Sequence, residues 1–270
     1  MTETLPSPAR TTGWTALLLA GQRPGGDRVA DHFGEQWKAL IPVAGEAMLS
    51  RVARTLLASP DIARVVVLAQ DPQALTARPD TAWLAKEPRV TCLTSQASIS
   101  LSVSAAAGSV GAPWPVLVTT ADHPLLTPAM VATFVAGVGG ADVAVGMVEQ
   151  RKLLAAYPDN VRTWIKLRGG AWSGANLFAL TSDKARAALD LWATVETDRK
   201  KVAKLFAAFG PLLALRAATR TISMDSALKA AGHRLGLAAT LVPLEFAEAA
   251  IDVDKPSDHA LAEAILRARA

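Results

Sequence analysis

Apolar and polar positions alternate along the first 150 residues in two kinds of segment. Short runs rich in Val, Leu and Ala predict buried strands, and segments with apolar residues three or four apart predict helices. Strands are predicted at 15–20, 64–69, 90–93, 116–120 and 142–148, and helices at 47–58, 100–109 and 128–138. Strands that alternate with helices in this way predict a parallel sheet with right-handed crossovers.

The pattern changes after residue 150. Residues 151–170 are polar and cationic, and further strands are predicted at 176–180 and 237–242. Helical patterns are predicted over 182–209, 223–231 and 256–268. Without a clear linker, we expect one α/β domain over 1–270, with a mostly parallel central sheet and a helical elaboration around 182–235.

Composition narrows the class of protein. The 270 residues are 51% hydrophobic, which supports a sizeable core, and the formal net charge is only +4. Few aromatic residues and no basic stripe argue against nucleic-acid binding. The single cysteine, Cys92, excludes a disulfide framework and is expected in the core. Residues 1–13 are polar and expected to be flexible. We find no signal peptide and no membrane span, and expect a cytoplasmic protein.

A loop rich in glycine and arginine, residues 21–28, follows the first predicted strand. Its glycines let backbone N–H groups approach an anion closely. Arg23 and Arg28 offer planar donors that match phosphate oxygens, and Lys38 adds a mobile charge. The loop matches neither a dinucleotide fingerprint nor a Walker loop. It therefore predicts a polyphosphate site, with a solvated surface loop as the alternative.

Two acidic positions are candidate ligands for a divalent cation. Asp122 follows the predicted strand 116–120, beside the loop, where a carboxylate could hold Mg²⁺ together with phosphate oxygens. Asp254 is the second candidate, and it alternates with Asp252 along an extended segment. The alternatives are that Asp122 braces its turn and that Asp254 belongs to an acidic helix start.

These motifs together resemble the MobA-like nucleotidyltransferases. The matching segments are Leu18–Gly21, Lys38–Leu49, Val118–Thr127, Ser173–Asn176 and Asp252–Asp258. The resemblance implies a Rossmann-like fold of the GT-A type, a three-layer α/β/α sandwich. It also implies a nucleotide-binding half, 14–150, and an acceptor-binding half, 151–270. Two features depart from the family: Gly25 stands where an arginine is usual, and 182–235 does not match the molybdopterin enzymes.

The resemblance assigns roles to residues. Expected to contact the nucleotide are Leu19, Ala20, Gly21, Gln22, Arg23, Lys38, Ser100, Ser102 and Asp122. Expected on the acceptor side are Arg162, Lys166, Arg168, Ser173, Gly174 and Asn176. Asp122 and Asp254 would hold Mg²⁺, and Lys38, Arg23 and Asp122 would be catalytic. Helix capping is the alternative for the serines, and an exposed cationic strand is the alternative for the three basic residues.

The predicted reaction is Mg²⁺-dependent transfer of a nucleoside monophosphate from a nucleoside triphosphate to a phosphorylated small molecule, with release of pyrophosphate. Likeness to cytidylyltransferases favours CTP. A glycosyltransferase is one alternative, although Asp122-His-Pro stands where such enzymes commonly carry D-x-D. A non-catalytic nucleotide-binding regulator is another. A second copy of the chain is a candidate partner.

Overall fold

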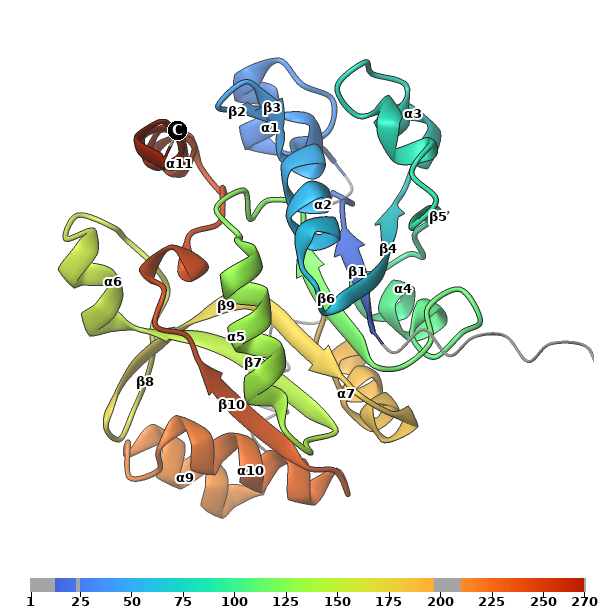
Figure 1. The fold of residues 1–270 in the computed structure, drawn as a ribbon. Helices are drawn as coiled ribbons and strands as arrows, with labels where there is room; N and C mark the ends of the chain where they lie inside the picture. Colours follow the sequence, from blue (N-terminus) through green and yellow to red (C-terminus); the bar gives the residue numbers. More distant parts are fainter. Residues whose placement is uncertain (1–12, 23–24, 197–209, 270) are drawn as a thin grey trace, which may run out of the picture.

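The computed structural model describes residues 13–22, 25–196 and 210–269, which form a mixed sheet covered by helices on both faces (Figure 1). The sheet has eight strands in the order β10-β7-β9-β6-β1-β4-β5, with β8 paired to β9. Its strands are β1 (Trp14–Leu19), β4 (Ile62–Ala69), β5 (Val90–Thr94), β6 (Val116–Thr120), β7 (Val143–Glu149), β8 (Ile165–Leu167), β9 (Gly170–Leu180) and β10 (Ala239–Pro243). A small hairpin, β2 (Pro42–Val43) and β3 (Glu46–Ala47), lies apart from it.

The sheet is parallel except around β9, which runs antiparallel to β6, β7 and β8. The strands β5, β4, β1 and β6 are parallel neighbours, and so are β7 and β10. Their carboxyl ends therefore meet along one edge, as the alternating pattern predicts. This arrangement confirms the expected α/β sandwich with a mostly parallel sheet.

The helices cover the sheet from both sides. They are α1 (Arg28–Phe33), α2 (Met48–Ala58), α3 (Pro72–Thr76), α4 (Ile99–Ala106), α5 (Pro128–Val138), α6 (Gln150–Ala156), α7 (Arg186–Glu196), α9 (Pro211–Ala218), α10 (Met224–Arg234) and α11 (Pro256–Arg269). Figure 1 shows α2 and α5 in front of the sheet, and α4 and α7 behind it. The last helix, α11, lies near the β2–β3 hairpin, where His259 Nε2 is 2.8 Å from the carbonyl oxygen of Pro42.

Successive residues of the central strands feed two separate cores. On β1, Ala16 and Leu18 join one buried cluster, whereas Leu17 joins the other. On β4, Val65 and Val66 divide in the same way. Because successive side chains of a strand point to opposite faces, an unbroken apolar run is what a strand covered on both faces requires.

Several short elements were not predicted from the sequence. Helix α1 lies where the sequence indicates a loop, and helix α6 lies where it indicates an irregular polar segment. Neither helix is long enough to show a helical period in the sequence. The predicted helix over 182–209 is described only in part, by a 3₁₀ turn and α7, and residues 197–209 lie outside the described residues. Helices α7, α9 and α10 confirm the elaboration around 182–235.

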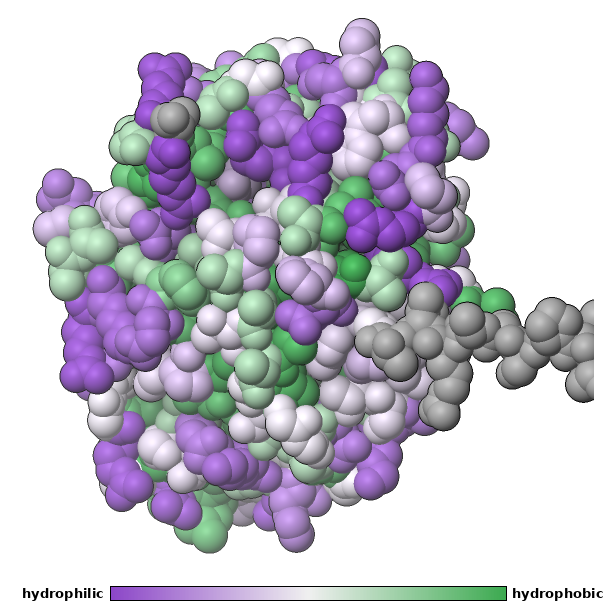
Figure 2. All heavy atoms as spheres, in the orientation of Figure 1, coloured by the Kyte–Doolittle hydropathy of each residue, from purple (hydrophilic) through white to green (hydrophobic). Residues whose placement is uncertain are grey.

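The surface in the view of Figure 2 mixes hydrophilic and hydrophobic residues. Among the helices of the described residues, none combines the length and apolar content that crossing a bilayer requires. One sheet contains strands from both 14–150 and 151–270. The division of labour between those two halves stays a prediction.

Candidate active site

The site lies at the carboxyl ends of β1 and β6, which are paired neighbours in the sheet. The glycine loop begins directly after β1, and Asp122 follows β6. The Ala121 amide donates to the carbonyl oxygen of Leu19 at 2.9 Å, which joins the two strand ends. Leu19, Ala20 and Gly21 are therefore beside Asp122, as the sequence predicts for a polyphosphate loop and a strand-end carboxylate.

Gln22 connects the glycine loop to Lys38. Its Oε1 accepts from the Lys38 amide at 3.1 Å, and its Nε2 donates to the Gln36 carbonyl oxygen at 3.0 Å. Lys38 then begins a 3₁₀ turn, Lys38–Leu40, whose Leu40 is buried. These contacts fix the backbone of Lys38 near the end of β1. The predicted neighbour Arg23 lies outside the described residues.

Asp254 reaches the same place from the far end of the chain. The Val253 amide donates to the carbonyl oxygen of Asp122 at 2.8 Å, which joins the segment before α11 to the end of β6. The Asp254 amide in turn donates to Asp258 Oδ2 at 3.1 Å, in the first turn of α11. This contact resembles one half of a capping box, so the capping alternative describes Asp258 and leaves the Asp254 carboxylate for other contacts.

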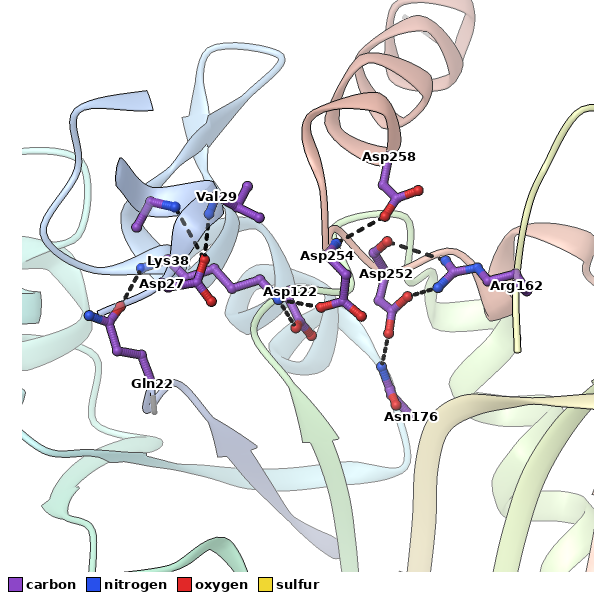
Figure 3. Close-up of polar contacts among 11 residues, drawn as sticks. Gln22, Asp27, Val29, Lys38, Asp122, Arg162, Asn176, Asp252, Asp254 and Asp258 are labelled. Atoms are coloured by element: carbon purple, nitrogen blue, oxygen red, sulfur yellow. Dashed lines mark hydrogen bonds and ion pairs between the residues drawn. The ribbon is translucent and has the colours of Figure 1, made fainter. Parts of the chain in front are cut away.

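The Lys38 ammonium lies between the two carboxylates (Figure 3). Lys38 Nζ donates to Asp122 Oδ2 at 2.6 Å and to Asp254 Oδ1 at 2.7 Å. Its side chain is 13% exposed, that of Asp122 21% and that of Asp254 61%. Burial by itself lowers the pKa of Lys38, but the attraction of Asp122 and Asp254 outweighs it and raises the pKa above its usual value. Lys38 is therefore a fixed cation at the centre of the site.

The donor set fits a hard divalent cation that also binds phosphate. Within the described part of the chain, no cluster of three or more His, Cys, Asp or Glu side chains could enclose a metal ion. Mg²⁺ does not need one, because it commonly takes one or two carboxylates together with phosphate oxygens and water. Asp122 Oδ1 is buried and has no hydrogen-bond partner among the described residues, so this carboxylate oxygen has unused acceptor capacity. Asp122 and Asp254 are thus suited to share such an ion with a nucleotide.

A second cluster lies beside the first and is centred on Asp252. Arg162 forms an ion pair with Asp252 Oδ1 and also donates to the Asp252 carbonyl oxygen at 3.2 Å. Asn176 Nδ2 donates to Asp252 Oδ2 at 3.0 Å. Figure 3 shows the Asp252 and Asp254 side chains diverging toward different partners. Arg162 is thus paired within the protein, and its guanidinium is mostly buried.

A bulge in β9 aims Asn176 at this cluster. Val145 of β7 stands opposite Phe178, but Met147 stands opposite Gly174, so extra residues of β9 are unpaired between them. Asn176 lies in this irregular stretch with φ of +50°, a left-handed conformation that asparagine tolerates better than most residues. Bulges of this kind commonly redirect a side chain near a functional site.

The other predicted acceptor residues are spread along the β8–β9 hairpin. Lys166 and Arg168 are exposed at β8, which agrees with the alternative of an exposed cationic strand. Ser173 is buried and Gly174 exposed, on the part of β9 that pairs with β7. Among the described residues, the structure brings Asn176 to the Asp252 cluster but shows no contact between that cluster and Lys166 or Arg168. Their acceptor roles stay predictions.

The predicted serines lie at the start of α4. Ser102 Oγ donates to the Ser98 carbonyl oxygen at 2.7 Å and accepts from the Gln96 amide at 2.8 Å. Ser100 Oγ is 3.0 Å from Ser98 Oγ, and both Ser100 and Ser102 are buried. The N-cap of α4 is Ser98, whose side chain accepts from the Leu101 amide, so within this serine run the capping alternative describes Ser98 rather than Ser100 or Ser102. A nucleotide contact by Ser100 or Ser102 stays a prediction.

Sequence reasoning missed Gln70, at the end of β4. Its Oε1 accepts from the Gln22 amide at 3.1 Å, and its Nε2 donates to the Gln22 carbonyl oxygen at 2.7 Å. A Cβ on Gly21 would stand 2.9 Å from Gln70 Oε1, so the glycine permits this close approach. Its position in the sequence could have indicated it, because a polar residue that directly follows a buried parallel strand lies at the edge of the sheet where ligands bind.

This α/β fold and this site are the arrangement that the sequence predicts for a nucleotide-dependent transferase. A family model for the MobA-like NTP transferase domain matches residues 16–189. The chain belongs to this family and is a nucleotidyltransferase.

Solved structures agree on the fold. A hypothetical transferase from Thermus thermophilus is 26% identical, with a TM-score of 0.75 over 92% of this chain and 99% of that one. CMP:2-keto-3-deoxy-manno-octonic acid synthetase, solved with CTP, is 15% identical, with a TM-score of 0.59 over 96% of this chain and 100% of that one. The 4-diphosphocytidyl-2C-methyl-D-erythritol synthase of Anaerococcus prevotii is 12% identical, with a TM-score of 0.59 over 95% of this chain and 96% of that one. A comparison with curated proteins finds no match.

Proposed function

We propose that this chain transfers a nucleoside monophosphate from a nucleoside triphosphate to a phosphorylated small molecule and releases pyrophosphate. CTP is the proposed nucleotide, and one protein of similar fold, a CMP synthetase, was solved in complex with CTP. The proposal is supported above all by one observation: Lys38, Asp122 and Asp254 meet at the carboxyl ends of β1 and β6, beside the glycine loop.

The chain supplies charge and position rather than a strong base. An acceptor phosphate oxygen is already anionic and can attack the α-phosphorus in line, so catalysis rests on alignment and charge stabilisation. Lys38 would bind the phosphates and offset the charge of the leaving pyrophosphate, and Arg23 would assist it. The glycine loop would hold the triphosphate through its backbone N–H groups.

Asp122 and Asp254 would hold Mg²⁺, which offsets phosphate charge and orients the reacting groups when it is bound. The support is the chemistry of the two carboxylates and the buried Oδ1 of Asp122, which is free among the described residues. We propose a different role for Asp252. Because Arg162 and Asn176 occupy both carboxylate oxygens of Asp252, this cluster would hold the segment that carries Asp254.

The acceptor is proposed to lie along β9 and β8. Ser173, Gly174 and Asn176 would border it, and Lys166 and Arg168 are exposed cations within the same hairpin. The contacts of Arg162 favour a positioning role over a direct grip on the acceptor. A second copy of the chain stays a candidate partner, which the molecular mass in solution would test.

A pyrophosphate-release screen tests the proposal. Purified protein would be incubated with CTP, GTP, ATP or UTP, crossed with sugar, alcohol and pterin phosphates, with and without Mg²⁺. We expect pyrophosphate from one nucleotide–acceptor pair only when the metal is present. Release of free nucleoside diphosphate with transfer of a sugar would favour the glycosyltransferase alternative. Nucleotide binding by calorimetry without pyrophosphate from any pair would favour the regulator.

A further inference from the structure

The two carboxylates proposed as metal ligands already share a cation that belongs to the protein. Lys38 Nζ is 2.6 Å from Asp122 and 2.7 Å from Asp254, so one ammonium occupies the space between them. Distances this short are those of charge-assisted hydrogen bonds. The formal charge of the three side chains is one negative unit, compared with two for the carboxylates alone.

Contacts within the protein hold Lys38 in this position. Its backbone amide is fixed by Gln22, its 3₁₀ turn is anchored by buried Leu40, and its side chain is only 13% exposed. Asp122 is held in turn by the Val253 amide, which donates to its carbonyl oxygen. The ammonium is therefore held within reach of both carboxylates by contacts of the protein itself.

A divalent cation and this ammonium cannot both sit between the two carboxylates without strong repulsion at such short range. A triphosphate changes the balance, because its several negative charges attract both cations at once. Lys38 can then donate to phosphate oxygens, which leaves oxygens of Asp122 and Asp254 to the metal. Asp122 Oδ1, which is buried and unpaired within the described part of the chain, has acceptor capacity that Lys38 does not use.

We propose that Lys38 acts as a placeholder for the metal: it suppresses binding of a free divalent cation to Asp122 and Asp254, and gives way only when a nucleoside triphosphate enters. This inference rests on the proposed function, since it assumes that the two carboxylates are metal ligands. It adds an order of events: the metal arrives with the nucleotide or after it, and not before. It also gives Lys38 a task that is separate from its contact with the phosphates.

The test is binding of Mn²⁺ alone, followed by electron paramagnetic resonance, to the full chain without nucleotide. Wild-type protein is expected to bind Mn²⁺ weakly. Lys38→Met, which removes the charge and keeps the length, is expected to bind it at least tenfold more tightly. Lys38→Gln is a second neutral variant, and Lys38→Arg is the matched control that keeps the charge and should stay as weak as wild type. Thermal melting of each variant checks that it is folded.

A double variant locates any gained site. Asp122→Asn added to Lys38→Met should abolish the gain in Mn²⁺ affinity, because one ligand is lost. Wild-type binding as tight as that of Lys38→Met and Lys38→Gln would overturn the placeholder, and so would gained binding that survives Asp122→Asn.

Failure of the placeholder differs from failure of the proposed function. In one outcome, wild-type protein binds Mn²⁺ tightly, loses that binding in Asp122→Asn and still releases pyrophosphate only with Mg²⁺. That result would overturn the placeholder role of Lys38 and leave the proposed function intact. Activity that does not need a divalent cation, together with no Mn²⁺ binding in any variant, sinks the metal assignment and the placeholder with it.

Discussion

Two clusters of charged side chains lie side by side in this molecule, and they are built in opposite ways. In the Lys38 cluster one cation serves two carboxylates, and no described residue donates to Asp122 Oδ1. In the Asp252 cluster one carboxylate is held by Arg162 and Asn176, and both of its oxygens are occupied. A group with spare bonding capacity can accept a ligand, whereas a fully bonded one holds the protein in shape. The comparison separates the residues that we propose to act in the reaction from those that we propose to hold them in position.

The largest expected effect comes from breaking the Lys38 cluster. Lys38→Met and Asp122→Asn should each lower turnover by about a hundredfold or more, by analogy with the loss of one preorganised charge-stabilising contact. The rate of pyrophosphate release at saturating substrates measures this. Lys86→Met is the matched control, because Lys86 is exposed and precedes β5, at the edge of the sheet opposite the carboxyl ends of the strands, and it should leave turnover unchanged. Wild-type turnover by Asp122→Asn protein would remove its catalytic assignment.

Breaking the Asp252 cluster should affect stability first. Arg162→Met leaves a partly buried carboxylate without its cation, which we expect to cost about 2 kcal/mol of unfolding free energy, less than for a fully buried pair because water screens this one. Urea denaturation measures the change, and Arg89→Met, at a more exposed pair, should shift it by about 0.5 kcal/mol or less.

The same variant distinguishes the two roles considered for Arg162. As a positioning residue it should lower kcat with little change in the acceptor KM, and Arg162→Met combined with Asp252→Asn should be less destabilised than the sum of the single variants. A large rise in the acceptor KM with unchanged stability would instead show that Arg162 grips the acceptor.

Gln70 sharpens the comparison, because it holds the backbone of Gln22, whose side chain contacts the Lys38 amide. Gln70→Ala removes both hydrogen bonds to the Gln22 backbone. Since these bonds are exposed to water, we expect the KM for the nucleotide to rise only about fivefold, the equivalent of about one net hydrogen bond. Steady-state kinetics at saturating acceptor measures it, with the exposed Gln73→Ala as control. A fall in kcat with an unchanged KM would contradict this role.

The sequence alone predicts those parts of the molecule that are marked by a local motif or by a periodic pattern of apolar residues. The apolar runs of β1, β4 and β6 and the strand-end position of Asp122 follow from periodicity and from the rule that parallel strands end at one edge. The pairing of Arg162 with Asp252 could not be predicted, because it joins residues 90 positions apart, and the contact of Asn176 with Asp252 depends on the bulge in β9. Gln22, Gln70 and Lys38 present the same problem, since hydrogen bonds between loops leave no periodic trace.

The smallest expected effect concerns a second brace, Tyr157. Its hydroxyl donates to Glu248 Oε1 at 2.8 Å, and so joins the end of α6 to the turn that leads into Asp252. Burial, then the hydrogen bond and charge of Glu248, raise the pKa of Tyr157 from 10.0 to about 12. A raised pKa means that folding favours the neutral phenol. This contribution to stability is therefore complete below pH 10 and is lost as the pH rises from 10 to about 12.

Tyr157 can be observed alone, because it is the only tyrosine in the chain. The absorbance of its phenolate should titrate with a midpoint near 12 in the folded protein and near 10 in urea. Glu248→Gln should move the folded midpoint part of the way back, since the charge is removed while the burial remains. The phenol is only half-buried, so Tyr157→Phe should change stability at neutral pH only slightly and flatten its decline at alkaline pH. A midpoint that is the same in folded and unfolded protein would show that the hydrogen bond between Tyr157 and Glu248 is not formed in solution.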